Sequence, residues 1–274
     1  MTKSALTIII ITIVLSILIP IVAILLIDKK YKLKLWVKII VPVSFITIVN
    51  LCAFLAYFFF YYHATEEVVE YLKDSDKVRV SSEINYYYFD NIENDDTAII
   101  FYGGAKVEEK SYAPMMHQLA QNGYDVYLLK LPLRFALFSQ TKADYVYQSK
   151  SIDRYENVYL MGHSLGGVCA SIDLAQTKLD YEGIIMLASY SSKPIDNKYK
   201  ALTIYGTEDH VMNRKEYEKN TVNLPNGYVS KIIEGGNHAN YGYYGAQKGD
   251  GEATISREQQ IDLTVSYITD FINA

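Results

Sequence analysis

The chain lacks the cysteine content that a disulfide framework or a cysteine-based metal centre requires. Its 274 residues include two cysteines, Cys52 in an apolar run and Cys169 in a predicted core helix. An excess of basic residues is also missing, since 26 lysines and arginines face 31 acids and leave a net charge of −5. Nucleic-acid binding needs a basic patch, so this balance argues against a nucleic-acid partner. The length suits one ordinary domain with an additional segment.

Charged residues are absent from two long N-terminal runs, residues 5–27 and 39–62. A helix over the first run would be roughly 35 Å long at about 1.5 Å per residue, enough to cross a hydrocarbon core of about 30 Å. A signal peptide is the alternative, but this run is too long for one and lacks a small-residue cleavage site. We predict two transmembrane helices, in which Pro20 and Pro42 are tolerated better than in soluble helices.

The short loop between these runs is rich in lysine. It holds Lys29, Lys30, Lys32, Lys34 and Lys38. Short lysine-rich loops stay in the cytoplasm, so we expect a multi-pass protein of the cell membrane with both termini outside. The predicted organisation is a transmembrane hairpin over residues 1–64, a juxtamembrane linker over 65–79 and an extracytoplasmic α/β domain over 80–274.

From about residue 78 onward, apolar strands alternate with amphipathic helices. This alternation predicts an α/β fold, with a mostly parallel sheet flanked by helices. The predicted strands cover residues 80–89, 97–104, 124–131, 157–164, 182–189, 201–206 and 228–236. The predicted helices cover residues 111–123, 165–177 and 256–273, the last opened by a capping box of Ser256 and Gln259. In such sheets the chemistry lies beyond the carboxyl ends of the strands.

Gly162, Ser164 and Gly166 form a Gly-x-Ser-x-Gly motif between a predicted strand and a predicted helix. This motif builds a sharp turn that exposes the serine hydroxyl, and the small flanking residues let the turn close. With 15 glycines in the chain, a chance match has odds of roughly one in twenty. The strand before the motif and the helix after it supply the required context, so we predict Ser164 as a nucleophile.

A serine nucleophile needs a histidine base that is oriented by a carboxylate. In this kind of sheet the chain order is Ser, then Asp or Glu, then His. His238 follows the last predicted strand in a glycine-rich loop, and Asp209 follows the strand before it. We therefore predict Asp209 as the acid and His238 as the base. The alternatives are His210 for the base, and Glu208 or Asp196 for the acid.

Two backbone N–H groups are needed to stabilise an oxyanion. We expect one from Leu165, just after the nucleophile. The other should come from Ala105 or its neighbour Lys106, in the loop after the strand at 97–104. Lys106, His163 and Tyr243 are candidate residues of the substrate pocket, although a solvated lysine, a histidine turned away from the serine and a packing tyrosine are the simpler interpretations.

Five stretches carry a resemblance to a known family: "FYGGAKVEEKSYAP", "MGHSLGG", "LASYSS", "IYGTEDHV" and "EGGNHANYGYYGAQKGDGEATISREQQ". Together they resemble the α/β-hydrolase superfamily, and in particular its bacterial membrane-anchored fold-5 branch, related to dienelactone hydrolases. The resemblance spans about residues 96–271 and implies a Ser164, Asp209 and His238 triad without a metal or organic cofactor. Gly103 departs from the proline common in the family, and the serine replaces the cysteine of dienelactone hydrolases proper, so lactone specificity does not carry over.

The leading interpretation is a membrane-anchored serine hydrolase that cleaves an ester, or a thioester or amide, of a small molecule or lipid. The alternatives are an acyltransferase at the membrane surface and a catalytically silent binding module. Residues 132–151 are the only candidate rim over the site. Residues 241–252 form a loop longer than His238 needs, and we expect Tyr243→Ala to alter substrate preference more than folding.

Overall fold

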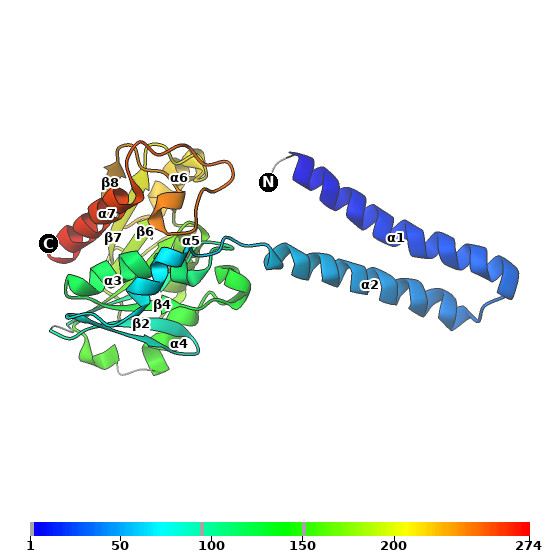
Figure 1. The fold of residues 1–274 in the computed structure, drawn as a ribbon, viewed down its shortest axis with the longest axis horizontal. Helices are drawn as coiled ribbons and strands as arrows, with labels where there is room; N and C mark the ends of the chain where they lie inside the picture. The colour runs from blue at the N-terminus through cyan, green and yellow to red at the C-terminus, as the bar shows by residue number, and fades with distance from the viewer. Residues whose placement is uncertain (1–2, 94–95, 150–151) are drawn as a thin grey trace. The chain divides into compact units, whose positions relative to one another are not determined.

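The computed structural model describes residues 3–93, 96–149 and 152–274, and the side chains at positions 3–10, 12, 149 and 153 lie outside this description. The chain divides into two compact units, one ending at Phe60 and one running from Tyr61 to Ala274 (Figure 1).

The first unit consists of helices α1 (Lys3–Tyr31) and α2 (Leu35–Phe59), which pack along each other. Near the turn between them, Lys38 Nζ lies 2.6 Å from Asp28 Oδ2. Further along the pair, Asn50 Nδ2 donates a hydrogen bond to Ser16 Oγ over 3.3 Å. These polar contacts fix how the two apolar helices lie against each other.

Within the described residues, α2 is the one helix long and apolar enough to cross a membrane, with a mean hydropathy of 2.4 in an 18-residue window. Part of the other predicted span, residues 5–27, lies outside the described side chains, so the two spans stay a prediction. Helix α2 ends at Phe59, three residues before the predicted limit of the second run. The reason is that Tyr62 forms a β-bridge with Val107 instead of continuing the helix.

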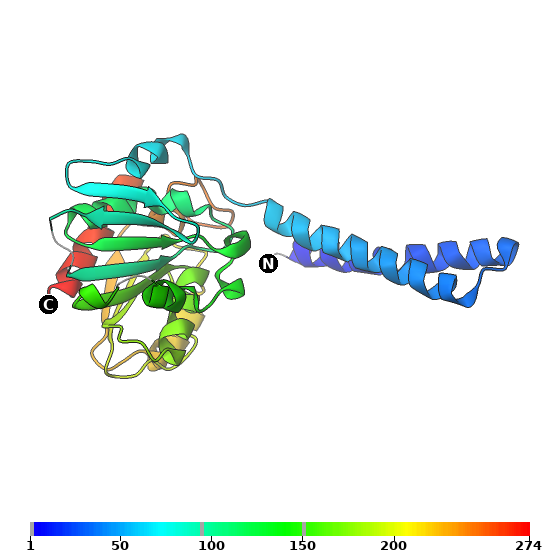
Figure 2. The same cartoon turned by 90° about the horizontal axis from the view of Figure 1, so that it is seen from below.

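The second unit is built on one eight-stranded sheet in the order β1-β2-β4-β3-β5-β6-β7-β8 (Figure 2). Strands β3 to β8 run parallel, and β1 and β2 add an antiparallel edge. The strands are β1 (Val78–Ser82), β2 (Tyr86–Asn91), β3 (Thr97–Tyr102), β4 (Asp125–Leu129), β5 (Asn157–His163), β6 (Gly183–Leu187), β7 (Lys200–Gly206) and β8 (Val229–Ile233). The predicted mostly parallel α/β sheet is therefore confirmed.

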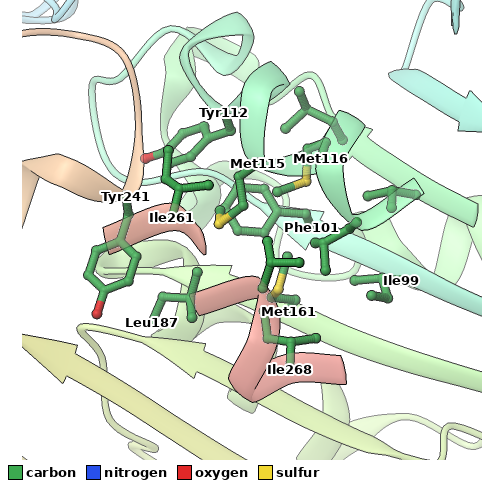
Figure 3. Close-up of a cluster of buried hydrophobic side chains, with 14 of the residues drawn as sticks. Ile99, Phe101, Tyr112, Met115, Met116, Met161, Leu187, Tyr241, Ile261 and Ile268 are labelled. Carbon is green, nitrogen blue, oxygen red and sulfur yellow. The ribbon is translucent and has the colours of Figure 1, made fainter. Parts of the chain in front are cut away.

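Helices cover both faces of the sheet because successive side chains of a strand point to opposite faces. On β3, Ile99 and Phe101 join a core with α3 (Ala113–Gln121) and α7 (Arg257–Ile272), shown in Figure 3. Ala98 and Ile100 join a second core with α4 (Lys142–Ser149) and α5 (Leu165–Gln176). Helix α6 (Arg214–Asn220) follows β7. The short 3₁₀ helices are η1 (Glu66–Leu72), η2 (Glu109–Tyr112), η3 (Pro132–Arg134), η4 (Ala136–Phe138), η5 (Ile152–Arg154), η6 (Thr221–Asn223) and η7 (Ala239–Tyr241).

Two local predictions have clear outcomes. The capping box at the start of α7 is confirmed, with Gln259 N donating to Ser256 Oγ and Ser256 N donating to Gln259 Oε1. The single strand predicted over residues 80–89 is wrong, because Glu83 N bonds to Tyr86 O and turns the chain back on itself. The segment therefore forms the end of β1 and the start of β2.

Candidate active site

The carboxyl edge of the sheet is where the backbone is strained. In the described part of the second unit, five non-glycine residues have φ between 45° and 65°, and they follow the ends of β3, β4, β5 and β6: Lys106, Leu133, Arg134, Ser164 and Ala188. Such strain persists only where the surrounding structure compensates it, and it gathers at functional sites. The predicted site residues come from this edge.

Ser164 stands in a tight turn between β5 and α5, with φ 55° and ψ −126°. Its N–H donates to Leu187 O, and its carbonyl accepts a bond from Ser189 Oγ. The glycines around it are required by contact: a Cβ on Gly162 would lie 2.5 Å from the Gly166 carbonyl carbon, and one on Gly166 would lie 2.2 Å from Tyr102 O. Only glycine lets the strand, the turn and the helix come this close.

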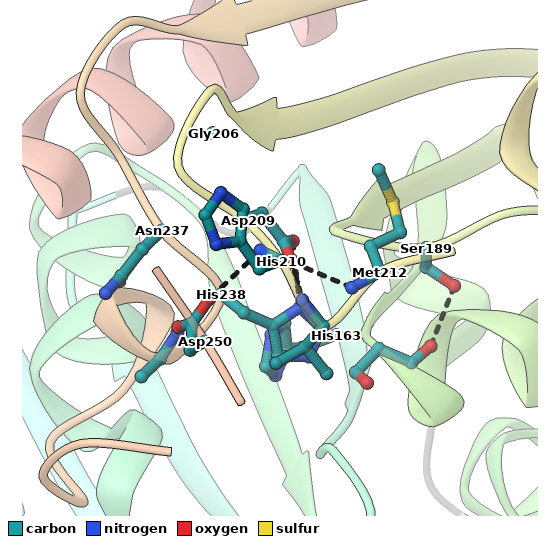
Figure 4. Close-up of polar contacts among 12 residues, drawn as sticks. His163, Ser189, Gly206, Asp209, His210, Met212, Asn237, His238 and Asp250 are labelled. Atoms are coloured by element: carbon teal, nitrogen blue, oxygen red, sulfur yellow. Dashed lines mark hydrogen bonds and ion pairs between the residues drawn. The ribbon is translucent and has the colours of Figure 1, made fainter. Parts of the chain in front are cut away.

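Asp209 and His238 are joined by a direct contact of 2.8 Å between Asp209 Oδ2 and His238 Nδ1 (Figure 4). They follow the neighbouring strands β7 and β8, and both side chains are buried. Asp209 Oδ1 also accepts bonds from the N–H groups of Val211 and Met212. Burial raises the pKa of Asp209, but the bonds from His238 and these N–H groups outweigh it and hold the pKa below its ordinary value. An ionised Asp209 keeps the proton of His238 on Nδ1 and leaves Nε2 free to accept one.

The rival acids and base lie apart from this pair. The imidazole of His210 is exposed. Asp196 Oδ1 accepts a bond from Lys198 N in a surface turn, and Glu208 Oε1 accepts one from Thr207 Oγ1. The structure brings only Asp209 onto His238.

Ser164 and His238 line one cavity of about 230 Å³. Its other walls come from the start of α5 and from the loops after β6 and β7: Leu165, Val168, Ala188, Ser189, Tyr190, Val211, Met212 and Asn213. His238 Nε2 is buried and has no hydrogen-bond partner among the described residues. Contacts between a base and its nucleophile are often long without substrate and tighten when it binds.

The loop after β3 lies directly against the turn at Ser164, since a Cβ on Gly166 would be 2.5 Å from Gly103 O. The N–H of Lys106 donates to Arg134 O, so it is not available to an oxyanion. Ala105 is the remaining candidate from this loop. Leu165 is the first residue of α5, where N–H groups have no partner within the helix. Leu165 and Ala105 therefore stay the candidate donors.

His163 does not line the cavity, although its ring lies 4.6 Å from that of His238 between centroids. It is fully buried, its Nδ1 lies 2.9 Å from Tyr112 Oη, and Tyr112 Oη accepts a bond from Gly104 N. The Tyr112 hydroxyl can accept this bond and at the same time donate to Nδ1 of a neutral His163 whose proton is on Nε2. Burial first, and the nearby His238 second, lower the pKa of His163 well below its ordinary value. The Gly104, Tyr112 and His163 chain fastens the loop after β3 to the turn that carries Ser164.

Acid is expected to destabilise the protein through His163. Below about pH 6.5 the unfolded chain binds a proton that the folded chain refuses, so stability falls as the pH falls, by up to about 1.4 kcal/mol per pH unit. His163→Asn keeps an acceptor for Tyr112 but has no group that titrates, so this loss should vanish. The free energy of unfolding of the variant should therefore rise relative to that of the wild type as the pH falls from about 6.5 to about 5. Urea unfolding at several pH values measures it, with His210→Asn as the exposed control. A constant difference between wild type and His163→Asn would contradict the expectation.

Like His163, the other two candidate pocket residues do not line the cavity. Lys106 and Tyr243 are absent from its lining. The Tyr243 hydroxyl bonds to Glu258, and its ring packs under the Arg257 guanidinium. The position of Tyr243 favours packing over substrate contact, so the effect expected for Tyr243→Ala shifts from substrate preference to stability.

Asp250 is a site residue that the sequence did not reveal. It lies in the loop after His238, where Oδ2 accepts a bond from Ala239 N over 2.8 Å and Oδ1 accepts one from His210 N over 3.3 Å (Figure 4). Ala239 follows the predicted base and His210 follows the predicted acid. One carboxylate therefore ties together the two loops that carry His238 and Asp209.

Asp250→Ala is expected to lower kcat on the order of tenfold to a hundredfold, because loosening these loops misplaces His238. It also leaves the buried Ala239 N–H without a partner, at a cost of about 1–3 kcal/mol in stability. Steady-state kinetics and thermal unfolding measure the two effects. Glu252→Ala, an exposed position in the same loop, is the control and should match the wild type. Unchanged kinetics in Asp250→Ala would show that the tie is dispensable.

Among the described residues, no three histidine, cysteine or acidic side chains are placed to hold a metal ion. The chemistry open to this site is that of a hydroxyl, an imidazole and a carboxylate lying in sequence along one edge of the sheet.

Several solved structures have a fold similar to that of this chain. The chain is similar to the dienelactone hydrolase of Anabaena variabilis, with 14% identity and a TM-score of 0.54 over 71% of this chain and 99% of that one. It is similar to the Francisella virulence factor BioJ, with 13% identity and a TM-score of 0.55 over 76% and 88%. A CIB-like hydrolase of Thermoplasma acidophilum has 16% identity and a TM-score of 0.53 over 70% and 99%. No curated protein matches the chain.

The family model of the alpha/beta hydrolase family matches residues 98–262, which is more than half of the chain and contains the whole candidate site. The resemblance seen in the sequence is thereby confirmed, and the chain belongs to the alpha/beta hydrolase family.

Proposed function

We propose that this hydrolase is a membrane-anchored serine enzyme that cleaves a carboxylic ester, or a thioester or amide, through an acyl-enzyme. The observation that carries the proposal is Ser164 in a strained turn, in one cavity with a histidine whose Nδ1 is bonded to the buried Asp209. The proposed nucleophile Ser164, acid Asp209 and base His238 follow each other along the chain in the order expected for this kind of sheet.

The proposed reaction begins when His238 Nε2 takes the proton of the Ser164 hydroxyl. Ser164 Oγ attacks the substrate carbonyl, and the N–H groups of Leu165 and Ala105 stabilise the oxyanion. The C–O bond breaks as His238 returns the proton to the leaving alcohol. Water, activated by the same imidazole, then releases the acid and restores the hydroxyl. Asp209 stabilises the charged imidazole at both steps.

The cavity favours an acyl group over a bulky polar one. Five of its lining side chains are apolar: Leu165, Val168, Ala188, Val211 and Met212. Pockets for drug-sized ligands have volumes of about 300–1,000 Å³, so a cavity of about 230 Å³ suits the acyl part of a substrate with the alcohol part outside.

The membrane anchor in this proposal rests on α2 and on the lysine-rich loop before it. With that loop in the cytoplasm, the hydrolase unit lies on the extracytoplasmic side of the membrane. Fusing alkaline phosphatase after Ala274 tests this side, since the fusion should be active in intact cells. Activity of a cytoplasmic reporter fused at the same position would show that the orientation is the opposite one.

Labelling with a fluorophosphonate tests the enzymatic part. The reagent phosphonylates an activated serine, so one adduct per chain is expected, on the peptide that contains Ser164. Digestion and mass spectrometry locate it. An adduct on another serine, or no adduct in protein that is folded by thermal unfolding, would refute the proposal.

A further inference from the structure

The segment that leaves α2 is fastened to loops of the catalytic edge. Tyr62 N donates to Lys106 O over 2.7 Å, and Glu108 N donates to Tyr62 O over 2.9 Å, so Tyr62 pairs with the loop after β3. The Tyr62 hydroxyl accepts a bond from Lys248 N, in the loop after His238. The chain therefore enters the hydrolase unit at the edge that carries Ser164, not at the opposite edge.

Exposed apolar side chains lie beside this entry point. Leu133, Leu137 and Phe138, called the rim here, are 41%, 41% and 48% exposed in the segment that follows β4. The Arg134 guanidinium lies 3.6 Å from the centroid of the Tyr61 ring, which joins the rim to the entering chain. Leu133 and Arg134 both have positive φ, at 50° and 56°. The rim thus places three exposed apolar side chains on and next to a turn whose backbone is strained.

The rim is also connected to the candidate active site. Lys106 N, one residue after the candidate oxyanion donor Ala105, donates to Arg134 O. Helix η4, which carries Leu137 and Phe138, packs against α5, the helix that starts directly after Ser164. The rim is therefore linked, through the loop after β3 and through α5, to the elements that carry Ala105 and Ser164.

We propose that the rim docks into the surface of the bilayer that holds α2, and that the substrate is an acyl ester of a bilayer lipid. This inference rests on the proposed function, both the membrane anchor and the serine chemistry. Tyr61 follows the last residue of α2 by two positions, a reach of at most about 7 Å. Tyrosine rings favour the membrane interface, and scattered apolar side chains beside them enter it.

Charges near the entry point are mixed, so the docking is apolar in origin. Lys106 and Arg134 are basic, while Glu108 is acidic and lies 3.7 Å from His63 Nδ1. A lipid surface with either neutral or anionic head groups is compatible with this set. The contribution that distinguishes the rim is its three exposed apolar side chains.

Docking can be measured without any enzymatic activity. The chain has one tryptophan, Trp36, so Trp36→Phe combined with Phe138→Trp places a single fluorophore in the rim. The full chain is reconstituted into vesicles of phosphatidylcholine with brominated acyl chains, and its emission should be quenched. The matched control is Trp36→Phe with Ile92→Trp, because Ile92 is 46% exposed and follows β2 beside Asp125, at the opposite edge. Equal quenching of the two, or none in either, would overturn the docking.

The substrate class is tested by the ratio of two hydrolysis rates in the same vesicles. One is the rate for monoolein, and the other is the rate for the soluble ester p-nitrophenyl acetate. In Leu137→Ser/Phe138→Ser this ratio should fall about tenfold or more, since two large apolar side chains no longer enter the lipid. Ile92→Ser should keep the wild-type ratio. An unchanged ratio in the rim variant would refute delivery from the bilayer.

These outcomes separate the two proposals. If the wild type hydrolyses neither substrate and is not labelled by the fluorophosphonate, the proposed function is refuted. The quenching experiment still decides whether the rim docks. Cleavage of p-nitrophenyl acetate with no cleavage of monoolein would keep the proposed function and refute the lipid substrate.

Discussion

Ser164→Ala is expected to lower kcat for ester hydrolysis by about a million-fold, the usual cost of removing the nucleophile from a triad. Besides Ser164, two hydroxyl side chains belong to the described lining of the cavity, Ser189 and Tyr190. The Ser189 hydroxyl is bonded to the Ser164 carbonyl, and neither residue stands in the turn between β5 and α5 that holds Ser164. Turnover of p-nitrophenyl acetate by the full chain in vesicles measures the loss. Activity within about a hundredfold of the wild type would remove Ser164 from the mechanism.

Ser164→Gly is the matched control for this variant. It also lacks the hydroxyl, so it should be equally inactive, but glycine adopts the backbone at φ 55° without strain. Relief of such strain is of order 1–3 kcal/mol, so Ser164→Gly should unfold at a higher temperature than Ser164→Ala. Equal melting temperatures would mean that the turn stores no strain.

Asp209→Asn is expected to lower kcat by about ten-thousand-fold while preserving the fold, because the amide stabilises the wrong tautomer of the histidine. In the wild type the carboxylate holds the proton on His238 Nδ1. An asparagine can donate its own N–H to Nδ1, which moves the proton to Nε2 and removes the base. Steady-state kinetics together with thermal unfolding measure the two parts of this expectation.

Glu208→Gln tests the specificity of that assignment. Glu208 is the neighbouring acid, and its carboxylate accepts a bond from Thr207 Oγ1 instead of contacting His238. Its variant should therefore keep kcat within about twofold, as surface changes do. A large loss in Glu208→Gln with little in Asp209→Asn would move the acid to Glu208.

The sequence was informative where chemistry and backbone geometry restrict the same few positions. Gly162 and Gly166 can be recognised because any side chain there would collide with main-chain atoms. The continuous apolar strands were found for a similar reason, since β3 to β6 are almost entirely buried on both faces and consist mostly of apolar residues. The buried charge in them is Asp125 at the start of β4, which is paired with Arg154. Such positions carry their structural role in the residue type itself.

The rest depends on contacts between distant segments, which residue types do not encode. Tyr62 belongs to an apolar run by composition, yet it pairs with Val107 and so ends α2 early. Asp250 looks like one more acid in a polar loop, and only folding brings it onto the N–H groups of Ala239 and His210. The backbone N–H of Lys106 is not available as an oxyanion donor because it donates to Arg134 O. These roles are set by the closure of loops over the sheet.

The position of β8 has a consequence for how activity is lost. It is the outermost strand, paired only with β7, and alternate side chains of β8 face solvent. Local opening is favoured where buried contacts are few, so we expect β8, with the His238 loop that follows it, to open at a lower free energy than the central strands. The bonds from Asp250 to the N–H groups of Ala239 and His210 are a second connection between the loops after β8 and β7. Inactivation by mild heat or denaturant therefore reports partial opening at this corner, well before the central strands exchange their amide hydrogens.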